Sequence, residues 1–234
     1  MTDLDLIDEL SRRLNDKVRE KEREFNEAEQ KGMRNLLETN PFMKKDVERA
    51  GLTIEQYSTQ ANEDAPFSEG RSGLRSFLAQ SYKVAISTAI DHYGLSPQRT
   101  MLRDWFQHGR FSKLSPEAKS FILSLAKRES EPITIYREQS KLPEGTEPDS
   151  IAFRSRVPRP WSSHDKPMMG SVTFILPECS VGTEVSFLSQ YPGEMEHVAV
   201  FPRGLVIESI EERRWGTYPK PRLRVTLREP TTGL

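Results

Sequence analysis

Cysteine is nearly absent from this chain, since Cys179 is the single one among 234 residues. One thiol excludes an internal disulfide and a zinc site built from cysteines. It is typical of a protein that matures in a reducing compartment. Histidine is also scarce, with four residues, and the chain has neither a His-Glu-x-x-His sequence nor a phosphate loop of the Gly-Lys-Ser kind. We therefore expect no bound metal.

Long apolar runs are missing as well. No stretch approaches the roughly 20 residues of a membrane-spanning helix, and the acidic start of the chain, Met1 to Asp5, lacks the apolar core of a secretory signal. The formal net charge of -1 gives no bulk attraction to nucleic acid or to acidic membranes. We expect neither as a partner. We expect the protein to be cytoplasmic, or delivered into a host or target cell without a classical signal peptide.

The first half of the sequence is predicted to be helical. Over residues 3–31, apolar residues recur at three-, four- and seven-residue spacing with charges of alternating sign between them, which predicts one long, largely exposed helix. Gly32 and Pro41 are expected to separate it from the next helix, Gly94 to end a later helix, and Ser115 to cap the last one. The shorter helices are expected near 43–50, 53–61, 74–93, 98–106 and 116–127.

Strand patterns replace helical spacing from Pro132 onwards. Short β-rich runs alternate with prolines and glycines. They lie at 133–137, 150–156, 171–176, 184–187, 198–201, 205–210 and 222–228. Helices followed by strands predict an α+β fold rather than alternating β-α-β units.

A pair of carboxylates, Glu194 and Glu196, lies between the turn at Pro192-Gly193 and a β-branched run. In an extended chain, side chains two residues apart point to the same face. Two such acids repel each other unless a cation, a ligand or burial compensates for the repulsion. The pair is therefore a candidate functional site.

Two further short motifs lie in the β half. Tyr136-Arg137 ends the first predicted strand, and Trp161-Ser162-Ser163 follows a proline-rich approach. A strand-end arginine offers a planar fork of donors for phosphate. By itself, however, each motif is also compatible with a surface residue or a turn.

Together with Tyr191-x-x-Glu194-x-Glu196, these motifs resemble those of the arginine–serine–glutamate class of mono-ADP-ribosyltransferases, which includes bacterial toxins, injected effectors and phage enzymes. The Tyr191-x-x-Glu194-x-Glu196 motif matches that of the family at each fixed position. The Trp161-Ser162-Ser163 motif matches in part, because His164 stands where the family has a second serine. The resemblance covers roughly residues 70–230. Ser155 is the alternative for the family's serine.

The resemblance implies NAD as co-substrate and an arginine of a target protein as acceptor. Glu196 would be the catalytic carboxylate at the ribose, and Glu194 would address the acceptor together with Tyr191. The residues implied in NAD binding are Tyr136, Arg137, Trp161, Ser162 and Ser163.

The resemblance also implies a domain division and a core type. Residues 1–66 would be a helical extension for docking, delivery or regulation, and residues 67–234 a catalytic domain with a mixed β-sandwich core. Two alternatives stay open at this point: an NAD glycohydrolase that uses water as acceptor, and a catalytically inactive relative that acts as a binding protein.

Overall fold

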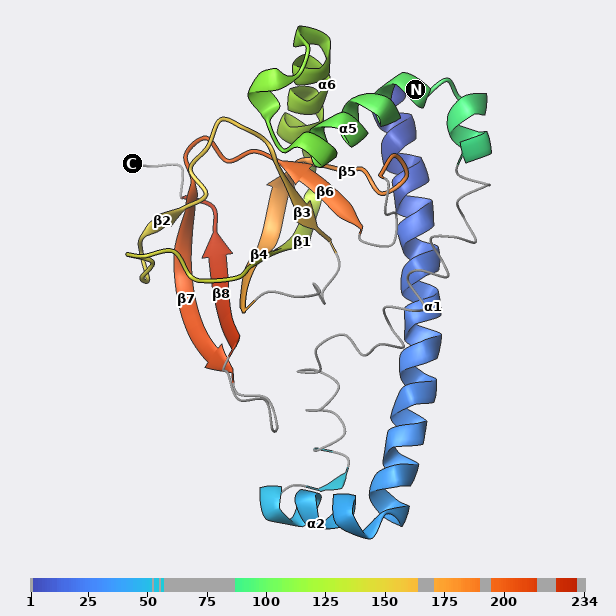
Figure 1. The fold of residues 1–234 in the computed structure, drawn as a ribbon, viewed down its shortest axis with the longest axis vertical. Coiled ribbons are helices and arrows are strands. Elements are labelled where there is room, and N and C mark those ends of the chain that lie inside the picture. Colours follow the sequence, from blue (N-terminus) through green and yellow to red (C-terminus); the bar gives the residue numbers. More distant parts are fainter. Residues whose placement is uncertain are drawn as a thin grey trace.

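The computed structural model describes residues 2–51, 53–54, 56, 87–163, 171–189, 195–213 and 222–230. The described chain is helical before residue 128 and consists of strands after it (Figure 1). The helical elements are α1 (Asp3–Thr39), α2 (Pro41–Ala50), α5 (Ser96–His108), the 3-10 helix η1 (Phe111–Lys113) and α6 (Pro116–Lys127). The strands are β1 (Glu129–Gln139), β2 (Ile151–Ala152), β3 (Arg159–Ser162), β4 (Val172–Val181), β5 (Thr183–Glu184), β6 (Glu196–Ala199), β7 (Leu205–Arg213) and β8 (Arg222–Arg228).

The long first helix is confirmed, but the expected interruption at Gly32 is wrong. Helix α1 continues to Thr39 because a glycine inside a helix costs only about 1 kcal/mol, and buried Leu37 packs the end of the helix. Asn40 separates α1 from α2: its side-chain oxygen accepts a hydrogen bond from the Phe42 amide at 3.0 Å, and Pro41 occupies the first helical position.

The later helices begin and end where local signals place them. The Ser115 side chain accepts a hydrogen bond from the Ala118 amide at 3.2 Å, which caps α6 at its predicted start. Gly94 has a φ of 70° and follows a helix over 87–92, so that predicted end is confirmed. The expected helix at 53–61 and the first part of that at 74–93 lie mostly outside the described residues.

The eight described strands form one mixed sheet in the order β2-β7-β8-β4-β1-β3-β6-β5. Strands β4 and β8 run parallel, and the other neighbours are antiparallel. The predicted α+β class, with helices followed by a mixed β core, is thus confirmed. Strand β3 was not predicted, because Pro160 lies in it and proline lacks a donor for the ladder.

Two hydrophobic clusters cover the two faces of the β3–β6 region. In β6, Val198 belongs to a cluster with the helices, whereas its neighbour Ala199 belongs to a cluster with strands β1, β3, β4, β7 and β8. Adjacent strand residues point to opposite faces. Since β6 and β7 are far apart in the sheet order yet share the second cluster, the sheet bends around it.

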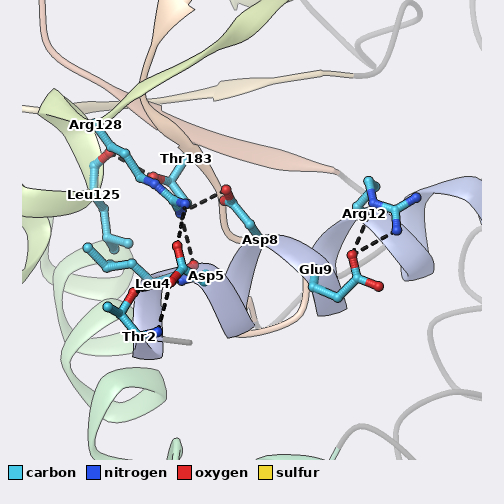
Figure 2. Close-up of polar contacts among 9 residues, drawn as sticks. All are labelled: Thr2, Leu4, Asp5, Asp8, Glu9, Arg12, Leu125, Arg128 and Thr183. Carbon is cyan, nitrogen blue, oxygen red and sulfur yellow. Dashed lines mark hydrogen bonds and ion pairs between the residues drawn. The ribbon is translucent and has the colours of Figure 1, made fainter.

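The first half of α1 packs on the β half of the molecule, and its second half continues beyond the strands to α2 (Figure 1). Ile7, Leu14 and Val18 of α1 are buried in the cluster that contains Val198. Charged contacts fasten the start of the helix (Figure 2): the Arg128 guanidinium lies 3.1 Å from the Asp5 carboxylate and 2.7 Å from that of Asp8.

The predicted division at residue 66 falls in 57–86, outside the described residues, and stays a prediction. No helix of the described ranges combines the length and apolar character that a membrane crossing requires.

Candidate active site

The structure brings one residue from each of the three motifs into a row across adjacent strands. Tyr136 of β1 pairs with Ser162 of β3, and Ser162 pairs with Glu196 of β6. Directly opposed residues of antiparallel strands share a face, with their Cβ atoms about 5 Å apart. All three side chains are half-buried. A hydroxyl and a carboxylate from segments 34 residues apart therefore meet beside a phenol ring.

Glu196 begins β6 and is held by a residue that sequence reasoning missed. The Ser189 hydroxyl donates a short hydrogen bond to the Glu196 carboxylate. The Glu196 carbonyl accepts from the Val185 amide at 2.8 Å, which ties the strand to the preceding turn. No sequence signal marks Ser189, since a lone serine after a strand is most often a turn residue.

The alternative serine lies outside this row. Ser155 belongs to the loop between β2 and β3, where its amide donates to the Phe201 carbonyl at 3.1 Å and its hydroxyl to the Val157 carbonyl at 3.2 Å. Ser162 is the serine that pairs with both Tyr136 and Glu196. The strand register therefore favours Ser162 over Ser155 as the counterpart of the family's serine.

Arg137 lies next to this row, on the opposite face of β1 from Tyr136 by strand alternation. One guanidinium nitrogen donates to the Pro160 carbonyl at 2.5 Å, while its buried Nε has no hydrogen-bond partner. Burial, and then the nearby Arg159 guanidinium, lower the pKa of Arg137 from its ordinary value. Among the described residues no carboxylate forms an ion pair with Arg137. A partly desolvated cation of this kind favours an anionic ligand.

Trp161 and Ser163 flank Ser162 and are more deeply buried. Trp161 packs edge-on against Phe153 and Phe201, with ring centroids 5.1 and 5.7 Å away. The Ser163 amide and hydroxyl donate to the Met195 carbonyl at 2.8 and 3.1 Å. These contacts fix β3 on both sides of Ser162. Direct contact of either side chain with NAD stays a prediction.

The chain is not extended immediately before Glu196. Met195 has a φ of 47° and is fully buried. Because a left-handed residue breaks the alternation of side chains, the two-residue spacing does not by itself bring Glu194 to the face of Glu196. Glu194, Tyr191 and His164 lie outside the described residues, so their predicted roles stay predictions.

Glu184 is a second residue that sequence reasoning missed. It lies at the end of β5, opposite His197 of β6, and its carboxylate accepts from the Asn15 amide of α1. Burial raises the pKa of Glu184, and the Ser163 hydroxyl, Arg19 and Asn15 oppose that rise. No local sequence pattern marks Glu184, because its hydrogen-bond partner Asn15 is 169 positions away in the chain.

The described residues contain no group of three metal-binding side chains. The groups present can bind an anion and can donate and accept hydrogen bonds. On one face of β1, Arg137 supplies a cationic donor with an unsatisfied Nε; on the other, the Tyr136–Ser162–Glu196 row supplies an aromatic ring, a hydroxyl and a carboxylate.

Three solved bacterial structures are similar to this chain. The type III effector XopAI of Xanthomonas axonopodis pv. citri, solved without 70 N-terminal residues, is 16% identical with a TM-score of 0.41, over 87% of this chain and 97% of the truncated one. An ADP-ribosyltransferase of Clostridium botulinum is 12% identical with a TM-score of 0.41, over 64% of this chain and 94% of that enzyme. Exoenzyme S of Pseudomonas aeruginosa, solved with human 14-3-3 protein beta and carba-NAD, is 13% identical with a TM-score of 0.38, over 88% of this chain and 90% of the enzyme.

The chain thus resembles bacterial ADP-ribosyltransferase toxins and effectors. At these identities and scores, the resemblance by itself assigns no activity to this chain. No protein-family model matches the sequence, and no curated protein matches it.

Proposed function

We propose that this protein is an NAD-dependent mono-ADP-ribosyltransferase that modifies an arginine side chain of a target protein. It would act as an effector or toxin in the cytoplasm, of its own cell or of a cell into which it is delivered. The observation that carries the proposal is the register of three adjacent strands, which aligns Tyr136, Ser162 and Glu196 on one face. Arg137 follows Tyr136 directly in β1 and donates to the Pro160 carbonyl of β3.

Each of these groups has a role in the proposed reaction. The NAD pyrophosphate is anionic, and Arg137 offers a desolvated planar donor with no carboxylate partner among the described residues. When the bond between ribose and nicotinamide breaks, nicotinamide leaves with the bonding electron pair and positive charge builds on the ribose. The Glu196 carboxylate stabilises that charge, and the Ser162 hydroxyl orients the ribose.

The roles proposed for the acceptor step rest on the motif Tyr191-x-x-Glu194-x-Glu196. A guanidinium is protonated at all ordinary pH values and is a poor nucleophile. Glu194 would align the target arginine and accept its proton as the new bond to the ribose forms. Tyr191 would pack against the target protein.

Labelled NAD and a lysate of candidate target cells test this proposal. The wild-type protein should label a protein band, and Glu196→Ala should not. Glu208→Ala removes an exposed carboxylate elsewhere on the sheet and serves as the matched control, which should label normally. Undiminished labelling by Glu196→Ala would refute the site assignment.

A second variant separates the two carboxylates. Glu194→Ala should abolish labelling of the protein while sparing hydrolysis of NAD, because only the acceptor step needs this carboxylate. Equal loss of both activities would contradict the acceptor role. Free ADP-ribose from the wild-type protein, with no labelled band in any lysate, would favour an NAD glycohydrolase instead.

A further inference from the structure

Three polar residues on one face of α1 reach the strands that carry the candidate site. They are spaced by four positions, so they lie along one side of the helix. The Ser11 hydroxyl accepts from the Phe187 amide at 3.3 Å, the Asn15 amide donates to the Glu184 carboxylate, and the Arg19 guanidinium donates to the Ser163 carbonyl at 3.4 Å. Helix α1 therefore contacts the serine motif and the turn that precedes Glu196.

Glu184 is the centre of these contacts. Its carboxylate accepts from the Asn15 amide of α1, and Ser163 and Arg19 are near enough to lower its pKa against the effect of burial. Burying a carboxylate costs free energy unless donors compensate for the lost water. An apolar residue would pack α1 against β5 without that cost, whereas a carboxylate that accepts from Asn15 also fixes the relative positions of α1 and β5.

The residues held in this way adjoin the two motif residues of the proposed reaction. Ser163 follows Ser162 directly, and Met195 precedes Glu196 directly. The Ser163 amide donates to the Met195 carbonyl, which links the two segments next to the row. Met195 has a left-handed φ, a conformation that costs a non-glycine residue of the order of 1 kcal/mol and needs support from its surroundings.

The start of α1 is anchored independently of this cluster. Arg128, at the end of α6, donates to the Leu4 carbonyl at 2.9 Å and pairs with Asp5 and Asp8 (Figure 2). The Thr183 hydroxyl, beside Glu184, donates to the Leu125 carbonyl of α6 at 2.9 Å. The helix and β5 are thus both fastened to α6, so Asn15 meets Glu184 between two fixed elements.

We propose that Glu184 is a positioning residue through which α1 sets the geometry of the site. Its hydrogen bond with Asn15, together with that from Arg19 to the Ser163 carbonyl, fixes α1 against the serine motif and so holds Ser162 and Glu196 at the correct separation. The expected effect on NAD cleavage rests on the proposed function. The expected effect on the position of Ser163 rests on the contacts alone. It makes the first five turns of α1 a working part of the site, in addition to any role of residues 1–66 in docking or delivery.

Steady-state cleavage of NAD by the full chain tests the kinetic consequence. Asn15→Leu and Glu184→Leu should each lower kcat at least tenfold and leave KM for NAD within twofold, because neither side chain touches NAD. Glu184→Gln keeps one acceptor oxygen and should recover most of kcat. Arg12→Ala, on the exposed side of the same helix, should change neither constant. A folded Glu184→Leu variant with unchanged kcat would overturn the proposal.

Amide hydrogen exchange tests the structural consequence without relying on activity. In the milder variant Asn15→Ala, the Ser163 amide should exchange at least tenfold faster, while the amides of β7 and β8 keep the wild-type rate. Unchanged exchange at Ser163 would overturn the proposal, as would equal acceleration throughout the sheet. If wild-type protein fails to cleave NAD, the proposed function fails, and exchange at Ser163 still decides the positioning role.

Discussion

The Ser189 hydroxyl donates a hydrogen bond to the Glu196 carboxylate, although seven residues separate them along the chain. Ser189 is buried and ends the turn that follows β5, and Glu196 begins β6. The turn therefore returns a donor to the carboxylate at the start of the next strand. A fixed hydrogen bond limits the rotamers of Glu196 and orients its charge toward the face that it shares with Ser162.

Replacement of Ser189 should therefore impair catalysis. We expect Ser189→Ala to lower kcat about tenfold to a hundredfold, because a hydrogen bond to a charged group contributes about 1.5–3 kcal/mol. Ser186→Ala is the matched control: the Ser186 hydroxyl is equally buried but has no hydrogen-bond partner among the described residues. Steady-state NAD cleavage checks the pair, and equal losses in both variants would contradict a specific role for Ser189.

Arg137→Lys should weaken NAD binding. Lysine keeps the positive charge but lacks the planar fork of donors, so we expect the dissociation constant for NAD to rise about tenfold to a hundredfold. Titration calorimetry with NAD measures this change. Arg156→Lys, an exposed arginine in the loop before β3, is the control and should bind like the wild type. Wild-type affinity for NAD in Arg137→Lys would rule out the proposed binding of the pyrophosphate by Arg137.

His197 should make stability depend on pH. Its ring nitrogen Nε2 donates to the Val181 carbonyl at 3.0 Å, and burial lowers the pKa of His197 from 6.5 to about 4. The unfolded chain then binds more protons than the folded one between these values. Stability is fully present above pH 6.5 and falls as the pH drops toward 4, by about 3 kcal/mol in total.

Urea unfolding at pH 7 and pH 4 checks this expectation. His197→Gln keeps a donor for Val181 but does not titrate, so its loss of stability on acidification should be smaller than that of the wild type by about that amount. Glu184, whose pKa is raised, acts in the opposite sense: its contribution to stability decreases as the pH rises from 4.5. It is present in both proteins and cancels in the comparison. Identical pH profiles would exclude His197 as the source.

Gly182 should resist substitution. Its φ is 113°, and a Cβ atom there would lie 2.4 Å from the His197 Nε2 and 2.5 Å from the Val198 carbonyl oxygen. We expect Gly182→Ala to lower the free energy of unfolding by about 2 kcal/mol or more, because β6 backbone must move as well. Gly145→Ala is the control. Gly145 also has a positive φ but no neighbour within 4 Å, so it should lose only about 1 kcal/mol. Equal losses would show that the contact with β6 does not matter.

Local sequence signals predicted most of the elements but not all their extents. Helix α6 and strand β8 begin and end at the predicted residues, since Ser115 caps the helix and β8 alternates cleanly. The predicted strand at 150–156 shortens to Ile151–Ala152. Strand β3 escaped prediction because of Pro160. That residue is accommodated because its carbonyl accepts from Arg137 and β1 pairs with β3 at Ser162 alone.

By itself, the sequence determined which half of the chain is helical, which half forms strands, and where the helices are capped. It also identified Arg137, Ser162 and Glu196 as the residues that match the family motifs. These depend on interactions between residues close in the chain. Tertiary structure alone decided that Tyr136, Ser162 and Glu196 share one row, and that Ser189 and Glu184 support it. Such contacts join segments up to 169 positions apart, and their formation depends on the packing of the whole core, which no local pattern encodes.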